Sequence, residues 1–172
     1  MNQWHVAIVG GGFGGIRTAL DLTARSRNVH VTLVSDKTHF EYHPALYKIV
    51  TGTSPLEVCI PLIDIFKKTD VDVVYDSVLS VDIPQKVVIG SSGSKYHYDF
   101  CVLALGSQTA YYSIPELEKY SFGCKSINEA LRLNSHIHEM FERCHAESAT
   151  QKEYSLRFIV AGGGATGVEL SA

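Results

Sequence analysis

The chain has 172 residues, of which 45% are hydrophobic and 19% are charged, and its formal net charge is −3. This length and apolar content predict one core of ordinary size, and the small net charge without a long basic run argues against a nucleic-acid partner. Every apolar run is far shorter than the ~20 residues that span a bilayer. No basic segment precedes the first run, which argues against a secretory signal.

The first 35 residues show a strand, a glycine turn, a helix and a second strand. The apolar run His5–Val9 stops abruptly at Gly10–Gly15. Apolar residues then recur at helical spacing over residues 16–24, and His30–Val34 is rich in β-branched residues, as strands are. Together these segments predict a βαβ unit of about 30 residues.

The middle of the chain mixes turn signals with short alternating runs. We expect a loop over Thr38–Pro61 with one short helix near Ala45–Ile49, a helix over Ile60–Lys67, and strands over Val71–Val81, Lys86–Gly90 and Tyr96–Leu105. The last strand becomes fully apolar, which is typical of a buried parallel strand.

A long helix and a second glycine turn follow. Ser126 and Glu129 form a capping box, and the apolar face behind it predicts an amphipathic helix that ends in the polar stretch Ala146–Glu153. Leu156–Ala161 is then expected to be a strand that leads into a second glycine turn and the start of a helix.

These elements predict an α/β fold: a doubly wound parallel sheet of the Rossmann type, with an antiparallel β-meander as crossover. We expect a nucleotide-binding domain over residues 1–112, a helical linker over 113–154, and an incomplete second Rossmann unit over 155–172.

The first glycine turn has the spacing of a dinucleotide fingerprint. Gly10, Gly12 and Gly15 match G-x-G-x-x-G between a strand and a helix. The first glycine permits the tight turn, the second lets the backbone approach a pyrophosphate, and the third lets helix and strand pack closely. Glycine clusters also serve as plain turns, but the βαβ context favours nucleotide binding.

The residue that binds the ribose is expected at the end of the second strand. Ser35 and Asp36 follow Gly15 by 20 and 21 residues, close to the ~20 that the fingerprint requires. Asp36 is the candidate. The alternative is a solvated loop acid beside Lys37.

The second turn repeats the first. Gly162, Gly164 and Gly167 have the same spacing and also follow an apolar run. Two fingerprints in one chain imply two dinucleotides, and flavin in the first with nicotinamide in the second is a common pairing that passes hydride between them.

Five segments resemble motifs of the type II NADH dehydrogenases (NADH:quinone oxidoreductases), which belong to the two-dinucleotide flavoproteins. They are Ile8–Gly15, His43–Tyr47 with Val50–Gly52, Tyr98–Ser107, Ser126–Leu131 and Gly162–Leu170. The resemblance covers essentially the whole chain.

The resemblance implies two sets of ligand-binding residues and no metal site. FAD would be bound by Gly10, Gly12, Phe13, Gly14, Gly15, Ser35, Asp36, Lys37, Thr51, Val78, Ala104, Leu105 and Gly106. NADH would be bound by Gly162, Gly164, Ala165, Thr166, Gly167 and Glu169. Glu169 is also the candidate catalytic residue, near the contact between flavin and nicotinamide. Its alternative role is to complement the helix dipole from the first turn.

The chain departs from the family pattern in several places. The family's ribose acid aligns with Ser35, and the usual Ala-Thr-Gly reads Ala104-Leu105-Gly106, which removes a hydroxyl. Thr38–Tyr47 contains no cysteine, whereas disulfide reductases of this superfamily carry a cysteine pair there. The four cysteines are widely separated, so we expect reduced thiols.

The resemblance implies an FAD-dependent oxidoreductase that takes hydride from NADH and passes electrons to a quinone, in the cytoplasm or peripherally on the inner membrane face. Because the second unit is expected to be incomplete, this chain is expected to turn over slowly. Because the final strand of the FAD domain is also expected to be missing, an uncovered sheet edge should lead to a homodimer or a larger species. The family's membrane-binding helices are likewise expected to be absent. The alternatives are an inert FAD- or nucleotide-binding module, a truncation product, or a sulfide:quinone reductase-like enzyme.

Overall fold

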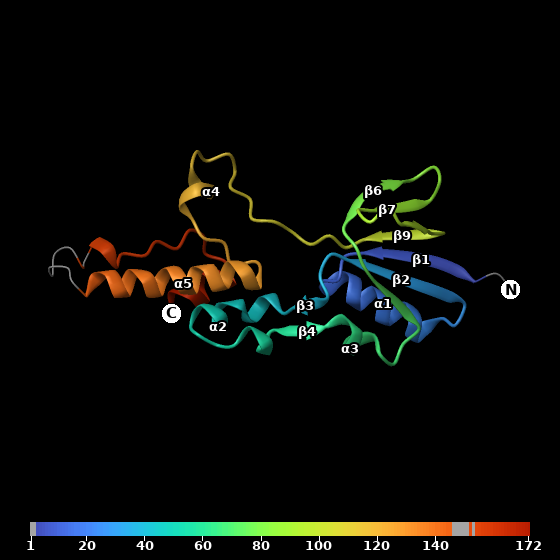
Figure 1. The fold of residues 1–172 in the computed structure, drawn as a ribbon, viewed down its shortest axis with the longest axis horizontal. Coiled ribbons are helices and arrows are strands. Elements are labelled where there is room, and N and C mark those ends of the chain that lie inside the picture. Colours follow the sequence, from blue (N-terminus) through green and yellow to red (C-terminus); the bar gives the residue numbers. More distant parts are fainter. Residues whose placement is uncertain (1–2, 146–151, 153) are drawn as a thin grey trace. The chain divides into compact units, whose positions relative to one another are not determined.

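The computed structural model describes residues 3–145, 152 and 154–172 (Figure 1). The chain folds as two compact units. The first unit comprises residues 1–41 and 59–107, and the second comprises residues 42–58 and 108–172. Each unit therefore contains segments that are distant in sequence.

A four-stranded parallel sheet forms the centre of the first unit. Its strand order is β5-β2-β1-β9, and the strands are β1 (Trp4–Val9), β2 (Val29–Ser35), β5 (Val71–Tyr75) and β9 (Phe100–Leu103). All three neighbouring pairs are parallel. The carboxyl ends of β1, β2 and β9 consequently lie along the same edge of the sheet.

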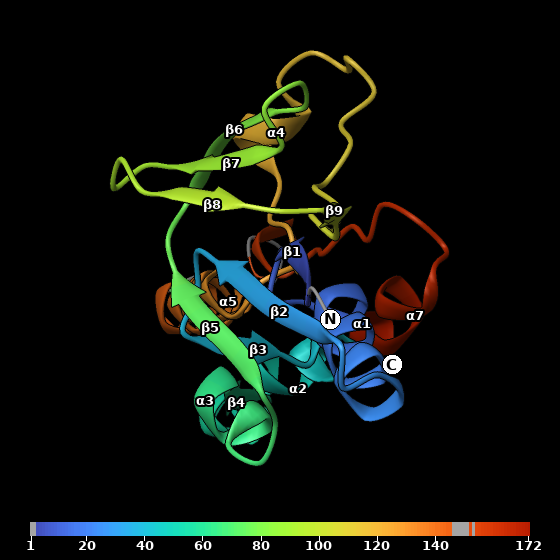
Figure 2. The same cartoon turned by 90° about the vertical axis from the view of Figure 1, so that its right-hand side faces the viewer.

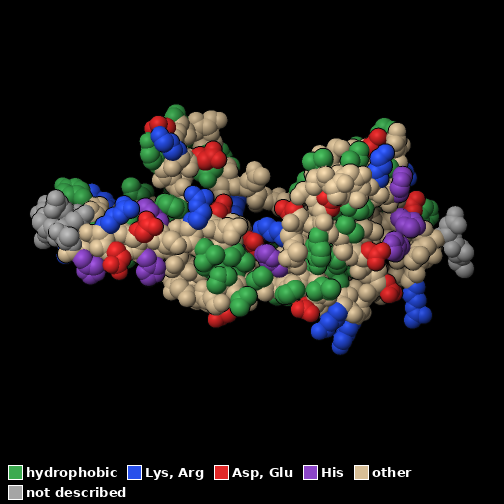
Figure 3. Space-filling view, viewed as in Figure 1, with side chains coloured by type: hydrophobic (Ala, Val, Ile, Leu, Met, Phe, Trp, Pro, Cys, Tyr) green, Lys and Arg blue, Asp and Glu red, His purple; other side chains and the backbone are tan. Residues whose placement is uncertain are grey.

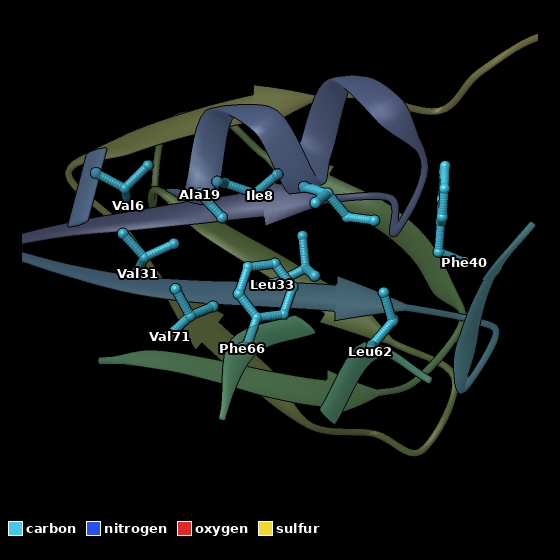
Figure 4. Packing of buried hydrophobic residues seen from close by; sticks show 10 residues of the cluster. Val6, Ile8, Ala19, Val31, Leu33, Phe40, Leu62, Phe66 and Val71 are labelled. Atoms are coloured by element: carbon cyan, nitrogen blue, oxygen red, sulfur yellow. The ribbon is translucent and has the colours of Figure 1, made fainter. Parts of the chain in front are cut away.

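Helices cover one face of this sheet. Alternate residues of β1, Val6 and Ile8, face α1 (Phe13–Arg25) and α3 (Leu62–Phe66) in one core cluster. Figure 4 shows the side chains of Ile8, Leu33 and Ala19 packed between the sheet and the helix. Burying such a side chain contributes about 1.5–3 kcal/mol each.

An antiparallel meander covers the other face. It consists of β6 (Val78–Asp82), β7 (Val87–Gly90) and β8 (Lys95–His97). Ala7 and Val9 of β1 pack on this side against Val88 of the meander. Figure 2 shows the meander and α1 on opposite sides of the sheet. The expected α/β fold with an antiparallel crossover is therefore confirmed.

Several expected boundaries were wrong because pairing between distant segments decides them. The expected loop over Thr38–Pro61 contains a short hairpin of β3 (His39–Glu41) and β4 (Cys59–Pro61). Ile60 pairs with Phe40 in that hairpin, so the helix expected from Ile60 begins at Leu62.

The strand expected over Tyr96–Leu105 is two strands, because the chain changes partner in its middle. β8 pairs with β7 of the meander, whereas β9 pairs with β1 of the parallel sheet. At the change, the Asp99 amide donates to the His5 carbonyl at 2.8 Å, and the Asp99 carboxylate accepts from the His5 amide at 2.8 Å. Likewise, Val71–Val81 is divided into β5 and β6.

The described part of the second unit is helical. It holds α2 (Leu46–Val50), α4 (Leu117–Tyr120), α5 (Ile127–Cys144) and α7 (Ala165–Ser171), with 3-10 turns over His43–Ala45 and Pro55–Glu57. One half of the capping box is formed: Ser126 Oγ accepts from the Glu129 amide at 3.2 Å. The Glu129 carboxylate accepts at 2.6 Å from the amide of Lys125, one residue before the N-cap. The polar end expected for this helix, Ala146–Glu153, lies largely outside the described residues.

The expected strand over Leu156–Ala161 is not formed. A strand needs a neighbour for its backbone hydrogen bonds, and the described residues of the second unit include no strand. The second glycine turn therefore follows an extended segment without sheet pairing.

The described residues include no helix that is both long and apolar enough to cross a membrane. Figure 3 shows acidic, basic and histidine side chains mixed along α5, without a broad area of one sign on this face.

A buried carboxylate joins β5 to the turn of the meander. Asp76 accepts from Ser91 Oγ at 2.9 Å, from Ser92 Oγ at 2.5 Å and from the Tyr96 hydroxyl at 2.8 Å. Hydrogen bonds from Ser92 and Tyr96 hold the pKa of Asp76 well below its usual range. Gly90 lies so close to this carboxylate that no side chain fits there.

Replacing Asp76 with Asn should lower the melting temperature at neutral pH. The Asn side chain is uncharged and has only one acceptor oxygen, so it cannot replace the two carboxylate oxygens that accept from Ser91, Ser92 and Tyr96. The lowered pKa means that the contribution of Asp76 is fully present above the ordinary carboxyl pKa of about 3.9 and is lost as the pH falls further. Thermal melts of the two proteins should therefore differ equally at pH 7 and at about pH 5, and should approach each other only as the pH falls well below about 4. The exposed Asp70→Asn is the matched control, and an equal effect of both substitutions would contradict this account.

Candidate functional site

The first glycine turn is shaped by two close backbone contacts. Gly10 has a φ of +112°, and a side chain there would overlap the carbonyl oxygen of Ala104. A side chain on Gly15 would overlap the carbonyl oxygen of Gly10. The Gly10 amide donates to the Val34 carbonyl at 2.8 Å, which ties the turn to the end of β2. Gly10 and Gly15 are therefore required by the fold itself.

Gly12 has no such requirement. It is the N-cap of α1 with an ordinary φ of −89°, and a Cβ built on it would meet nothing within 4 Å. No side chain caps this helix, and the N–H groups of a first helical turn have no intrahelical acceptor. An open approach in front of a positive helix end fits a pyrophosphate. The residues present thus fit the phosphates of a dinucleotide.

The end of β9 lies beside this turn. The Ala104 amide donates to the Val9 carbonyl at 2.8 Å, and a Cβ on Gly14 would lie 3.6 Å from the Ala104 Cβ. Leu105 is 70% exposed, and Gly106 has a φ of +73°. The two expected FAD motifs of the first unit are consequently adjacent in space.

The residues expected at the ribose differ in exposure. Ser35 is buried, and its hydroxyl donates to the Lys37 carbonyl at 2.8 Å and accepts from the Lys37 amide at 3.2 Å. A Cβ on Gly11 would lie 2.6 Å from Ser35 Oγ, so Ser35 packs against the glycine turn. Asp36 is exposed. The structure thus places Ser35 against the turn and Asp36 toward solvent.

An acidic residue that the sequence analysis missed lies next to these residues. Glu41 has a side chain only 6% exposed and accepts from Lys37 Nζ at 2.8 Å, while His39 Nε2 lies 3.5 Å from the same oxygen. The aromatic neighbours Phe13 and Phe40 meet edge-on with ring centroids 4.8 Å apart. Glu41 had no sequence signal, because its burial follows from the β3–β4 hairpin.

Two further expected FAD residues belong to other elements of the chain. Val78 begins β6 and packs into the cluster between the parallel sheet and the meander. Thr51 belongs to the second unit, where its hydroxyl donates to the Lys48 carbonyl at 2.9 Å at the end of α2.

The second glycine turn repeats the backbone of the first. Gly162 has a φ of +116°, and a side chain on Gly167 would overlap the Gly162 carbonyl oxygen. Gly164 is the N-cap of α7, and a Cβ there would meet nothing within 4 Å. The Val168 amide donates to the Gly164 carbonyl at 3.1 Å, as the Ile16 amide does to Gly12 at 3.0 Å. The two turns therefore have the same kind of backbone geometry.

The remaining expected nicotinamide residues, Ala165, Thr166 and Glu169, are exposed on α7. α7 has no acid in its first turn, because Glu169 is its fifth residue. The alternative role of Glu169, complementing the helix dipole from the first turn, is therefore wrong.

The cysteines are not arranged for thiol redox chemistry. All four are free. Burial raises the pKa of the thiols of Cys101, Cys124 and Cys59, and the nearby Glu129 and Glu41 raise the last two further. A raised pKa keeps a thiol protonated and unreactive at neutral pH. These thiols are structural in character, and the described residues hold no metal-ligand cluster.

Comparison with known proteins agrees with this geometry. The sequence pattern of the pyridine nucleotide-disulphide oxidoreductase family matches residues 4–172. The chain belongs to this family. Its match runs through both glycine turns, although this member lacks the cysteine pair expected of a disulfide reductase after β2.

The names of individual relatives describe oxidoreductases that act on quinones. The chain is 31% identical over 173 residues to the type II NADH:quinone oxidoreductase Ndh of Mycobacterium tuberculosis, covering 97% of this chain and 37% of that protein. It is 28% identical over 138 residues to the sulfide-quinone reductase of Aquifex aeolicus, and the match covers 80% of this chain and 32% of that protein. The predicted resemblance to type II NADH:quinone oxidoreductases is confirmed.

Solved structures give the same result. The structure of NDH2 from Plasmodium falciparum in complex with RYL-552 superposes with a TM-score of 0.85 at 26% identity, covering 99% of this chain and 36% of that one. The sulfide:quinone oxidoreductase of Aquifex aeolicus superposes with a TM-score of 0.75 at 27% identity, and the match covers 81% of this chain and 32% of that one. The chain spans about a third of the length of these relatives.

The two kinds of glycine can be separated by mutation. Gly15→Ala should destabilise the first unit by roughly 1–3 kcal/mol, because its methyl group overlaps the Gly10 carbonyl. Gly12→Ser should leave the free energy of unfolding nearly unchanged, because Ser is a good N-cap and has room there. Chemical denaturation in the absence of ligand measures both. Equal destabilisation by the two substitutions would contradict the assigned geometry.

Proposed function

We propose that this chain is the FAD-binding part of an FAD-dependent oxidoreductase that takes hydride from NADH and passes electrons to a quinone. The observation that supports this most is the pair of glycine turns with the same backbone, each at the start of a helix. Each turn fits one pyrophosphate, and the resemblance assigns FAD to the first turn and NADH to the second.

The residues of the chain would bind and orient these ligands. The first turn would hold the FAD pyrophosphate in front of Gly12, with the adenosine ribose near Ser35 and Asp36 and the end of β9 beside it. The second turn would hold the pyrophosphate of NADH in front of Gly164. Bound FAD would supply the hydride-accepting chemistry.

The acceptor is inferred from what the relatives have in common. The names of the relatives from Mycobacterium tuberculosis and Aquifex aeolicus differ in the electron donor but share quinone. A relative from Synechocystis, 30% identical over 177 residues, is also named as a quinone reductase, demethylphylloquinone reductase NdbB. Because such quinones dissolve in membranes, we propose that the whole enzyme works peripherally at the cytoplasmic face of a membrane.

A second candidate is a sulfide:quinone reductase-like enzyme, favoured by the similarity to the Aquifex aeolicus protein. The second glycine turn favours NADH as the donor, because sulfide needs no dinucleotide site. The raised pKa values of Cys59, Cys101 and Cys124 also disfavour sulfur chemistry at these thiols. A nucleotide-binding module without catalysis is the remaining alternative.

Gly12→Val should abolish flavin retention, because its side chain fills the space in which the pyrophosphate would approach. Gly164→Val is the matched control: it makes the same change in the second turn and should leave FAD bound. The visible absorption of the purified variants gives the flavin content. Equal flavin in the Gly12→Val variant and the unmodified protein would refute the assignment.

The electron donor is tested by anaerobic stopped-flow mixing of the flavin-loaded whole protein with NADH or with sulfide. Bleaching of the flavin absorption near 450 nm is expected with NADH, about tenfold or more slower in Gly164→Val at subsaturating NADH, because a blocked pyrophosphate site costs at least one charge-assisted contact. Reduction by dithionite, which needs no binding site, serves as the control. Rapid bleaching by sulfide but not by NADH would support the second candidate instead.

A further inference from the structure

Lys37 is held in one position by three hydrogen bonds. Its amide donates to Ser35 Oγ at 3.2 Å, its carbonyl accepts from the same hydroxyl at 2.8 Å, and its ammonium donates to Glu41 Oε1 at 2.8 Å. The Lys37 side chain is 42% exposed, whereas that of Glu41 is 6% exposed. A partly exposed cation is thus paired with a buried anion.

This pair lies where a dinucleotide site distinguishes two kinds of ribose. Ser35 ends β2 and packs against Gly11 of the first turn. At this place an acid hydrogen-bonds a free ribose 2′-hydroxyl, while a cation nearby accommodates a 2′-phosphate. This chain has Ser35 in place of the acid and Lys37 two residues later. An unpaired Lys37 would therefore favour a 2′-phosphate.

Glu41 reverses that preference by neutralising the ammonium. The other charged or titratable side chains of this segment are the exposed Asp36 and His39, whose Nε2 lies 3.5 Å from Glu41 Oε1. The carboxylates of Asp36 and Glu41 and the ammonium of Lys37 sum to one negative charge. A doubly charged 2′-phosphate would then meet net repulsion instead of attraction.

We propose that the Lys37–Glu41 pair makes the first dinucleotide site specific for an adenosine with a free 2′-hydroxyl and excludes 2′-phosphorylated adenosine. The inference rests on the proposed function, because it takes the first turn to be the FAD site. Glu41 acts as a positioning and charge-compensating residue, and it does not itself contact the ligand. If the Lys37–Glu41 ion pair only stabilised the fold, its loss would change the affinity for both kinds of adenosine equally.

The test compares ADP-ribose with 2′-phospho-ADP-ribose, which differ only in the 2′-phosphate. Each is titrated against the flavin-loaded chain, and the rise of FAD fluorescence on release reports displacement from the first site alone. The unmodified protein should bind ADP-ribose in preference. In Glu41→Gln the ratio of the two dissociation constants should shift about tenfold or more toward 2′-phospho-ADP-ribose, as expected for one gained charge-assisted contact.

Two further variants keep the result interpretable. The double substitution Lys37→Met with Glu41→Gln removes both charges. It should therefore lose the shift toward 2′-phospho-ADP-ribose that Glu41→Gln alone produces. Lys37→Met alone leaves the Glu41 anion and should shift the ratio in the opposite direction, which provides a test even if Glu41→Gln does not fold.

The outcomes separate the two proposals. If ADP-ribose displaces FAD but the ratio is the same in all variants, the inference about Lys37 and Glu41 is wrong and the FAD site stands. If the chain binds no FAD, both are wrong. If it binds FAD but neither ADP-ribose nor 2′-phospho-ADP-ribose displaces it from any variant, the inference about Lys37 and Glu41 is wrong and the FAD site stands.

Discussion

The turn between β1 and α1 depends on a backbone contact that only glycine permits: the Gly10 carbonyl oxygen lies where a Gly15 side chain would be. This contact brings the helix against the strand and directs its amino end toward the carboxyl edge of the sheet. Gly162 and Gly167 make the same contact in the second unit. The geometry of both turns is therefore set by the backbone, and the selectivity that we propose for the first turn depends on side chains beside it, such as Lys37.

The parts of the fold that depend on local chemistry could be predicted from the sequence. Both glycine turns were found because a G-x-G-x-x-G spacing between a strand and a helix needs no knowledge of distant residues. The helix start at Ser126 was found for the same reason, and the structure forms the side-chain cap there. β1 and β2 were also found to within a residue, because strands buried in a parallel sheet are continuous apolar runs.

The parts that depend on distant pairing could not be predicted. Glu41 is buried because β3 pairs with β4, and β4 lies about twenty residues further along the chain. Asp76 is satisfied by a meander turn whose position no local pattern reveals. Leu156–Ala161 has the composition of a strand but no strand beside it among the described residues. Likewise, no sequence signal showed that residues 42–58 fold with residues 108–172.

Hydrogen–deuterium exchange of the chain, measured by mass spectrometry with FAD or with NADH, tests the central claim most directly. If the two turns bind different dinucleotides through their backbone N–H groups, FAD should slow exchange in peptides that contain Gly11–Gly15 and leave Gly163–Gly167 unchanged. NADH should slow exchange at the second turn of the flavin-loaded protein. Protection of the second turn by FAD, or of neither turn by either ligand, would contradict the account.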